Sequence, residues 1–393
     1  MTEPDPSFPP PPPSSTAPPP GGPAAVPARA SRGRTVAAIA LSLLGVLIVV
    51  VVIAGFLIRV PYVVISPGEA MPLDSGVVTI SGAPTFENDN DVLFLTVRVT
   101  NQKPNLWRFI TASLDPDVAV EKRSLVVGCL NPEESSRYNT LLMQQSQGDA
   151  KNVALTRLGY TVTADPPRVT IVETCPGAPA YGQLAVGDQV LAVDGEGVTD
   201  SSQLVSLVRA RNPGEDVGFT VERDGMTRTA TVTAGEISAD GTRCRKVGPG
   251  APGSGEACIG AASRGFVTFH FPIEVTINTE RVGGPSAGLA FTLAIIDDLT
   301  PGALTDGKRV AVTGSIASDG TVEPVGGIEQ KAITARRNGV QLMLVPGSEV
   351  AEARNGAEGM KVVGVETIDD ALAALQEAGG SSVPPVQSTA ARS

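Results

Sequence analysis

The stretch VTGSIASDGTVEPVGGIEQKAITARRNGV, residues 312–340, combines the end of a strand, a polar turn and a helix. The helix is expected to begin after Gly327 and to end at Asn338-Gly339, which is a typical C-terminal signal. Four of its residues share one face at helical spacing: Ile328, Lys331, Ala332 and Ala335. Lys331 is therefore predicted to point inward, where a lysine is costly unless it has a function. The alternative is a lysine at the edge of the apolar stripe, with its ammonium group reaching solvent.

A second stretch, RVGGPSAGLAF at residues 281–291, places Ser286 between a glycine-rich turn and an apolar helix that runs to about Ile296. Ser286 is either a nucleophile or only a helix start. Nothing in these residues could deprotonate its hydroxyl, so a catalytic Ser286 would need a base from elsewhere in the chain. A lysine has an ordinary pKa of about 10.4, and burial lowers that value. An inward-facing Lys331 could therefore be the missing base, as in known Ser-Lys pairs.

Together, GGPSAG and the lysine of PVGGIEQK resemble the proteolytic domain of Lon proteases, and residues 312–340 resemble that family throughout. The resemblance implies a Ser-Lys peptidase in which Ser286 is the nucleophile, Lys331 is the general base and Thr313 helps to orient the lysine. Gly283 stands where many Lon proteases carry an acidic residue. Backbone N–H groups of Gly284 and Ala287 are candidates for holding the oxyanion of an acyl-transfer reaction.

Residues 155–235 resemble a PDZ domain of the bacterial protease type. The matching residues are Ala178-Pro179-Ala180, Leu184, Gly187-Asp188, Val190 and Val193-Asp194-Gly195, followed by a hairpin turn at Asp224-Gly225. PDZ domains bind extended peptides at a sheet edge. The loop for the peptide end would fall at Leu158–Val162, which contains Gly159, Tyr160 and Thr161. The alternative is a packing spacer that binds no peptide.

An uncharged apolar run at residues 35–58 is long enough to cross a hydrocarbon core of about 30 Å as a helix. Arg29, Arg32 and Arg34 precede it and Arg59 follows, so the positive-inside rule predicts a cytoplasmic N-terminus and an extracellular remainder. A single-pass, uncleaved anchor in the cell membrane is expected. Residues 1–34 are Pro-rich and are expected to be a disordered spacer.

The fold class expected from these segments is a multidomain α/β (α+β) protein. It comprises the membrane helix, a β-rich juxtamembrane region at 60–150, the PDZ domain, a Lon-type domain at 236–376 with alternating strands and helices, and a flexible tail at 377–393.

The four cysteines all lie on the predicted outer side, where an even number favours disulfides. Four cysteines allow three pairings. Cys244–Cys258 is favoured because the residues between them are typical of a flexible loop closed at its base, and Cys129–Cys175 then follows by elimination. No CxxC spacing occurs, so no metal site is predicted.

A net charge of −11 argues against non-specific binding of nucleic acid. The stretch GALTDGK, residues 302–308, approaches a phosphate-binding loop, but Arg309 follows it instead of Ser or Thr. We therefore expect no ATP and no cofactor. The sequence predicts an ATP-independent serine endopeptidase that acts on extracytoplasmic proteins or peptides, with a homo-oligomeric ring suggested by analogy alone. The alternatives are a catalytically silent PDZ scaffold and a Ser-His hydrolase that uses His270, the only histidine.

Overall fold

The computed structural model describes residues 32–73, 76–88, 91–100, 102–238, 240–241, 243–248, 255–279 and 282–383. The predicted disordered spacer spans residues 1–34, of which 1–31 lie outside the described residues. The predicted tail spans residues 377–393, of which 384–393 lie outside them. The chain divides into two compact units, residues 1–55 and 56–393.

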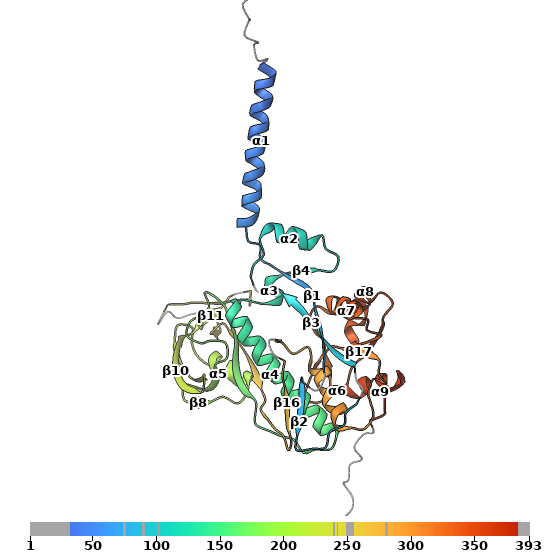
Figure 1. Ribbon diagram of the computed structural model, residues 1–393. Helices are drawn as coiled ribbons and strands as arrows, with labels where there is room; N and C mark the ends of the chain where they lie inside the picture. The colour runs from blue at the N-terminus through green and yellow to red at the C-terminus, as the bar shows by residue number, and fades with distance from the viewer. Residues whose placement is uncertain are drawn as a thin grey trace, which may run out of the picture. The chain divides into compact units, whose positions relative to one another are not determined.

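Helix α1, Arg32–Leu57, makes up the described part of the first unit and continues to the start of the second (Figure 1). Within the described residues, Val36–Leu57 is the segment that is long and apolar enough to cross a membrane. Its large apolar side chains are exposed, as expected for a helix whose surroundings would be lipid.

A six-stranded sheet organises the second unit, with strand order β21-β20-β17-β3-β1-β4. Its strands are β1 (Tyr62–Pro72), β3 (Asp91–Val99), β4 (Ala119–Lys122), β17 (Arg309–Val312), β20 (Leu342–Pro346) and β21 (Lys361–Val365). Strands β3, β17, β20 and β21 are parallel, whereas β1 is antiparallel to β3 and β4. The sheet therefore joins strands from both sides of the PDZ segment. Residues 60–150, predicted as a β-rich juxtamembrane region, supply β1, β3 and β4 to this sheet. Strand β3 is apolar on both faces and is buried between helices.

Alternate residues of these strands face two different helical layers. On one face, Phe94 and Val312 belong to the same core as α4 (Pro132–Arg157), α6 (Gly288–Leu299) and α9 (Ile368–Glu377). On the other face, Leu95 and Ala311 pack with α7 (Ile328–Arg337) and α8 (Val350–Ala357). Helices α6 and α7 agree with the two helices that the sequence analysis placed after Ser286 and after Gly327.

The PDZ segment forms a second sheet with strand order β10-β9-β7-β6-β14 (Figure 1). Its elements are β6 (Arg168–Thr174), β7 (Gln189–Val193), β8 (Glu196–Gly197), α5 (Ser201–Arg209), β9 (Asp216–Arg223), β10 (Met226–Thr233) and β14 (Ala261–Phe266). The predicted hairpin turn is confirmed, with φ values of 52° at Asp224 and 73° at Gly225. The last strand, β14, lies beyond the predicted domain end at residue 235 and pairs antiparallel with β6.

The remaining elements are short. They are β2 (Val78–Ser81), α2 (Leu106–Ser113), α3 (Arg123–Val126), β5 (Thr163–Ala164), β11 (Gly235–Ile237), β12 (Cys244–Arg245), β13 (Ala257–Cys258), β15 (Phe269–His270), β16 (Glu274–Ile277), β18 (Ser315–Ile316), β19 (Val322–Glu323) and the 3-10 turn η1 (Gly347–Glu349). Strand β11 pairs with both β12 and β13 next to the PDZ sheet.

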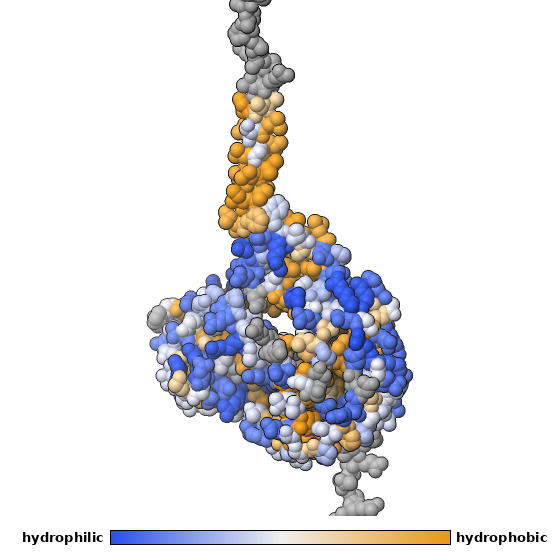
Figure 2. All heavy atoms as spheres, viewed as in Figure 1, coloured by the Kyte–Doolittle hydropathy of each residue, from blue (hydrophilic) through white to orange (hydrophobic). Residues whose placement is uncertain are grey.

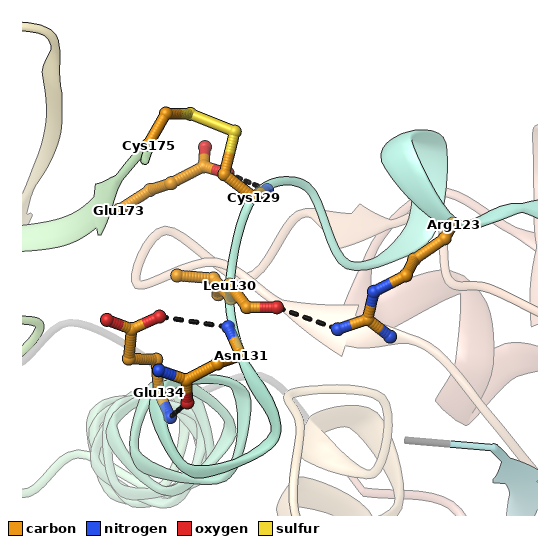
Figure 3. Close-up of a disulfide and its surroundings, with 7 residues drawn as sticks. All are labelled: Arg123, Cys129, Leu130, Asn131, Glu134, Glu173 and Cys175. Atoms are coloured by element: carbon orange, nitrogen blue, oxygen red, sulfur yellow. Dashed lines mark hydrogen bonds between the residues drawn. A yellow bond between two sulfur atoms is a disulfide. The ribbon is translucent and has the colours of Figure 1, made fainter. Parts of the chain in front are cut away.

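Two disulfides confirm the predicted pairings, Cys129–Cys175 and Cys244–Cys258. Figure 3 shows the first of them beside Glu173, whose carboxylate accepts a hydrogen bond from the N–H of Cys129 at 2.5 Å. Asn131 caps α4 just after this cysteine, and its N–H donates to Glu134. The disulfide therefore ties the start of α4 to the loop that follows β6 of the PDZ sheet.

Candidate functional site

Ser286 is half-buried in the turn that leads into α6. Its carbonyl oxygen accepts two hydrogen bonds, from the N–H of Gly314 at 3.0 Å and from the hydroxyl of Thr313 at 3.2 Å. The N–H of Leu289 donates in return to the carbonyl of Gly314 at 3.1 Å. The serine turn is therefore fixed to the residues that directly follow β17, at the carboxyl end of the parallel strands.

Helix α4 supports the same turn through two further hydrogen bonds. The hydroxyl of Ser146 donates to the carbonyl of Pro285 at 2.9 Å, and the N–H of Gly284 donates to the carbonyl of Asn139 at 3.1 Å. Gly284 was predicted to be an oxyanion donor, but its N–H is already bound to Asn139 in this structure. The N–H of Ala287 makes no hydrogen bond to any described residue, so it is the candidate donor that remains.

The structure explains why Gly283 can stand where an acidic residue was expected. A Cβ atom at this position would lie 3.1 Å from the Cβ of Asn139. Asn139 on α4 thus takes up part of the space that a larger side chain at position 283 would need. A carboxylate could enter only if α4 or the turn moved.

Lys331 lies on α7 and is 1% exposed, as its inward position in the sequence pattern predicted. Burial lowers its pKa to about 7, and the charge of Glu349 opposes this by raising it. Its Nζ has no hydrogen-bond or ion-pair partner among the described residues. A lysine with a pKa of about 7 is about half neutral at pH 7, and its neutral form can accept a proton, as a general base must.

Glu349 was not identified from the sequence. It ends η1, directly after β20, and its Oε2 accepts a hydrogen bond from the N–H of Val325 at 3.0 Å. Burial raises its pKa, while the Val325 hydrogen bond and the charge of Lys331 lower it. No local pattern marks this residue, because the tertiary packing of α8 against α7 brings it close to Lys331.

Ser286 lies in the turn before α6 and Lys331 lies on α7, and these two helices cover opposite faces of the sheet that contains β17. Their side chains can meet only beyond the carboxyl end of β17, where Thr313 lies. Thr313 is fully buried and contacts Ser286 directly. No hydrogen bond joins Lys331 to Ser286 among the described residues, and such catalytic contacts often tighten only when substrate is bound.

His270 is exposed, and its Nε2 lies 3.0 Å from Oδ1 of Asp165. Among the described contacts, none links His270 to Ser286. The structure therefore offers the Ser-His hypothesis no supporting contact.

The predicted peptide-end loop, Leu158–Val162, lies away from α5. Leu158, Tyr160 and Val162 pack against the core that contains α4 and α6, and Gly159 forms the turn after α4. A cavity of about 250 Å³ instead lies between α5 and the segment β13–β14. Its lining is mostly apolar, with Arg209, Arg243 and Ser263 as the polar side chains, and includes Leu204, Val205, Val208 and Ile259.

Comparison with known proteins gives two domain matches. Residues 138–234 match the PDZ domain, and residues 263–377 match the Lon protease (S16) C-terminal proteolytic domain. Lon protease of Haemophilus influenzae is 38% identical over 93 residues, which is 23% of this chain and 11% of that protein. Lon protease of Azospirillum brasilense gives the same identity and coverage. The match thus spans about a tenth of the length of these relatives.

Among solved structures, the PDZ domain of the SdrC-like protein from Listeria innocua is 18% identical, with a TM-score of 0.20. The similarity covers 24% of this chain and 92% of that domain. The two domain matches and the apolar helix α1 together fit a membrane-anchored, PDZ-containing Lon-like protease.

Proposed function

We propose that this protein is an ATP-independent serine endopeptidase that cleaves extracytoplasmic proteins with a Ser286–Lys331 dyad. The observation that carries the proposal is the burial of Lys331. A lysine that is 1% exposed and has no ion-pair partner among the described residues costs folding free energy unless its neutral form has a use. The turn that holds Ser286 starts α6 next to this region of the sheet.

In the proposed reaction, Nζ of neutral Lys331 takes the hydroxyl proton as Oγ of Ser286 attacks a peptide carbonyl carbon. The resulting oxyanion would be held by backbone donors such as the N–H of Ala287, and one such donor is typically worth about 3 kcal/mol. The Lys331 ammonium then gives its proton to the leaving amine, and an acyl-enzyme remains. Lys331 next activates a water molecule, which releases the acid and restores the serine hydroxyl.

The arginines before the apolar segment favour a cytoplasmic N-terminus, which would place residues 60–393 outside the cell. The two disulfides support this proposal, because disulfides persist in oxidising compartments. ATP independence is part of the proposal, and it is supported by GALTDGK, residues 302–308, which lacks the Ser or Thr of a phosphate-binding loop.

We further propose that the PDZ domain binds an extended peptide of the substrate between α5 and β14. Strand β14 is the last strand of its sheet among the described residues, so its outer edge can accept a further strand. The adjoining apolar cavity, which also contains Arg209 and Arg243, suits an apolar side chain near a carboxylate. This location replaces residues 158–162 as the candidate peptide site.

The dyad can be tested by labelling membranes that contain the full chain with a fluorophosphonate, which reacts with activated serines. We expect Ser286→Ala and Lys331→Met to abolish labelling. Lys151→Met is the matched control, because Lys151 is also partly buried and burial lowers its pKa, but it lies on α4. This variant should be labelled like the wild type.

The competing hypotheses predict other results in the same experiment. A catalytically silent PDZ scaffold would leave the wild type unlabelled. A Ser-His hydrolase would lose labelling in His270→Ala and keep it in Lys331→Met. Labelling that persists in a folded Lys331→Met protein rejects the proposed mechanism.

A further inference from the structure

The start of α2 is hydrogen-bonded to the residues that directly follow the apolar helix α1. The N–H of Leu106 donates to the carbonyl of Ile58 at 3.0 Å, and the N–H of Val60 donates to the carbonyl of Pro104 at 3.0 Å. Ile58 is the residue directly after α1. If α1 crosses a bilayer, Ile58 is the first residue beyond the membrane helix. The first turn of α2 is then hydrogen-bonded directly to this residue.

The helix has two different apolar faces. On the inner face, the ring of Phe109 lies 4.9 Å from that of Tyr62, and Ala112 is buried. On the outer face, Ile110 is 37% and Leu114 is 79% exposed, and Trp107 is partly exposed at the same helical spacing. Figure 2 shows apolar side chains on the surface over α2. A helix that exposes an apolar face in this way is expected to be covered by a partner.

The short helix α3, which adjoins β4 as α2 does, also exposes apolar side chains. Leu125 is 76% and Val126 is 42% exposed. Leu114 and Leu125 are the two most exposed large apolar side chains outside α1 among the described residues. Leu114 directly follows the last residue of α2, Leu125 is the third residue of α3, and both helices adjoin β4.

A basic depression of about 710 Å³ lies beside these helices. Arg59, Lys103 and Arg123 line it, and no carboxylate is among its lining residues. Arg123 also donates to the carbonyl of Leu130 at 2.7 Å, which fixes its guanidinium. The nearest carboxylates in the described contacts are those of Glu134 and Glu173, which accept hydrogen bonds from the backbone N–H groups of the lining residues Asn131 and Cys129 but do not themselves line the depression. The three charged residues of the lining are thus all cationic, in a chain with a net charge of −11.

We propose that α2 and α3 form a second membrane contact, which lies in the headgroup region of the same bilayer that α1 crosses. Trp107, Ile110, Leu114 and Leu125 insert at the boundary between headgroups and acyl chains, where interfacial helices bury their apolar faces. Tryptophan is favoured at this depth. The basic depression binds the headgroups of anionic phospholipids. The inference rests on the proposed anchoring by α1 and not on the Ser286–Lys331 dyad.

Trp107 provides a direct test, because it is the only tryptophan in the chain. The full chain is reconstituted into vesicles of phosphatidylcholine and phosphatidylglycerol, with and without bromine on the acyl chains near the headgroup. We expect brominated lipid to quench most of the Trp107 fluorescence and to leave little for aqueous iodide to quench. Fluorescence that is unchanged by brominated lipid and fully accessible to iodide overturns the proposal.

Variants distinguish a specific role of the apolar side chains of α2 and α3 from a general effect of placing a charge on the protein surface. The double variant Leu114→Asp, Leu125→Asp should lose most of the quenching by brominated lipid, since both side chains are exposed and their replacement leaves the core intact. The matched control is Met226→Asp, which alters a 54% exposed apolar residue on the PDZ hairpin and should quench like the wild type. Equal loss in both variants contradicts a role for α2 and α3.

The headgroup part has its own outcome. Quenching should be stronger with phosphatidylglycerol than with phosphatidylcholine alone, and added salt should remove this difference. Equal quenching in both lipids overturns the assignment of the basic depression. Alkaline carbonate extraction reports separately on anchoring by α1, and fluorophosphonate labelling reports on the dyad, so a failure of either is distinguishable from a failure of this inference.

Discussion

The hydroxyl of Thr313 donates a hydrogen bond to the carbonyl oxygen of Ser286 at 3.2 Å, and this contact links the end of β17 to the serine turn. Replacing the buried Thr313 by valine removes this donor and leaves the carbonyl oxygen of Ser286 with the N–H of Gly314 as its partner among the described residues. We expect Thr313→Val to lower the free energy of unfolding by about 1 kcal/mol and to slow fluorophosphonate labelling. Thr313→Ser keeps the hydroxyl and should label faster than Thr313→Val. Equal rates in the two variants would argue against a positioning role for this contact.

Labelling of Ser286 should depend on pH through Lys331, whose pKa is about 7. Below that pH the lysine is protonated and cannot accept the serine proton, so the rate should fall about tenfold per pH unit. Above it the rate should level off. A labelling rate that is independent of pH between about 5 and 8 would contradict the assigned base.

The free energy of unfolding should also depend on pH through Lys331. The folded pKa of Lys331 is lowered, so the unfolded chain, with a lysine pKa of about 10.4, binds more protons between the two values. The free energy of unfolding of the wild type should therefore rise relative to that of Lys331→Met as pH increases from about 7 to about 10. Urea unfolding of both proteins across this range checks the sign.

Glu349 should tune the pH at which the dyad works. Its charge raises the pKa of Lys331, so Glu349→Gln should move the labelling profile to lower pH. Glutamine can still accept the hydrogen bond from the N–H of Val325. The matched control, Glu352→Gln, removes an exposed carboxylate from the next helix and should leave the profile in place. A shift to higher pH in Glu349→Gln would be inconsistent with this role.

Gly288 tests how closely α4 and α6 must approach. A Cβ at this position would lie 2.8 Å from Oγ of Ser146 and 3.1 Å from the backbone nitrogen of Ile316. Gly288→Ala should destabilise the fold by about 1–3 kcal/mol and disturb the serine turn. Gly326→Ala is the control, because a Cβ there meets nothing within 4 Å. Equal thermal unfolding midpoints in the two variants would show that the close contact is relieved without cost.

The disulfides should stabilise the fold to different extents. In the chain-entropy model, a cross-link between residues 46 apart is worth about 4 kcal/mol, and one between residues 14 apart about 3 kcal/mol. Replacing both Cys129 and Cys175 by serine should therefore cost more than replacing Cys244 and Cys258. Denaturant unfolding of the two double variants measures the order, and the reverse order would contradict the model.

Local patterns predicted much of this structure. The disulfide Cys129–Cys175 was predicted only by elimination. The helical stripe that contains Lys331, the hairpin turn at Asp224-Gly225 and the disulfide Cys244–Cys258 follow from residue spacing and turn chemistry, and the structure has them in those places. Each depends on neighbours that are close in the sequence. Short-range physics is sufficient for such features.

The long-range pairings could not be predicted in this way. The apolar strand β3 indicates burial on both faces, but nothing within it specifies β17 as its parallel neighbour. Likewise, nothing in the sequence of β14 indicates that it pairs with β6 and not with a strand of the sheet that contains β17. Tertiary packing of this kind also brings Glu349 close to Lys331. For this reason the sequence indicated Lys331 but not Glu349.

The pairing of β3 with β17 also has a consequence for biosynthesis. Asp91 and Arg309, which are joined at the start of these strands, are 218 residues apart. During synthesis, β3 is apolar on both faces and lacks its partner β17 until most of the remaining chain has been made. The PDZ sheet likewise cannot acquire its edge strand β14 until the ribosome has passed the residues that follow β10. A chain that terminates before β17 is therefore expected to aggregate or be degraded rather than to leave a usable domain at the membrane.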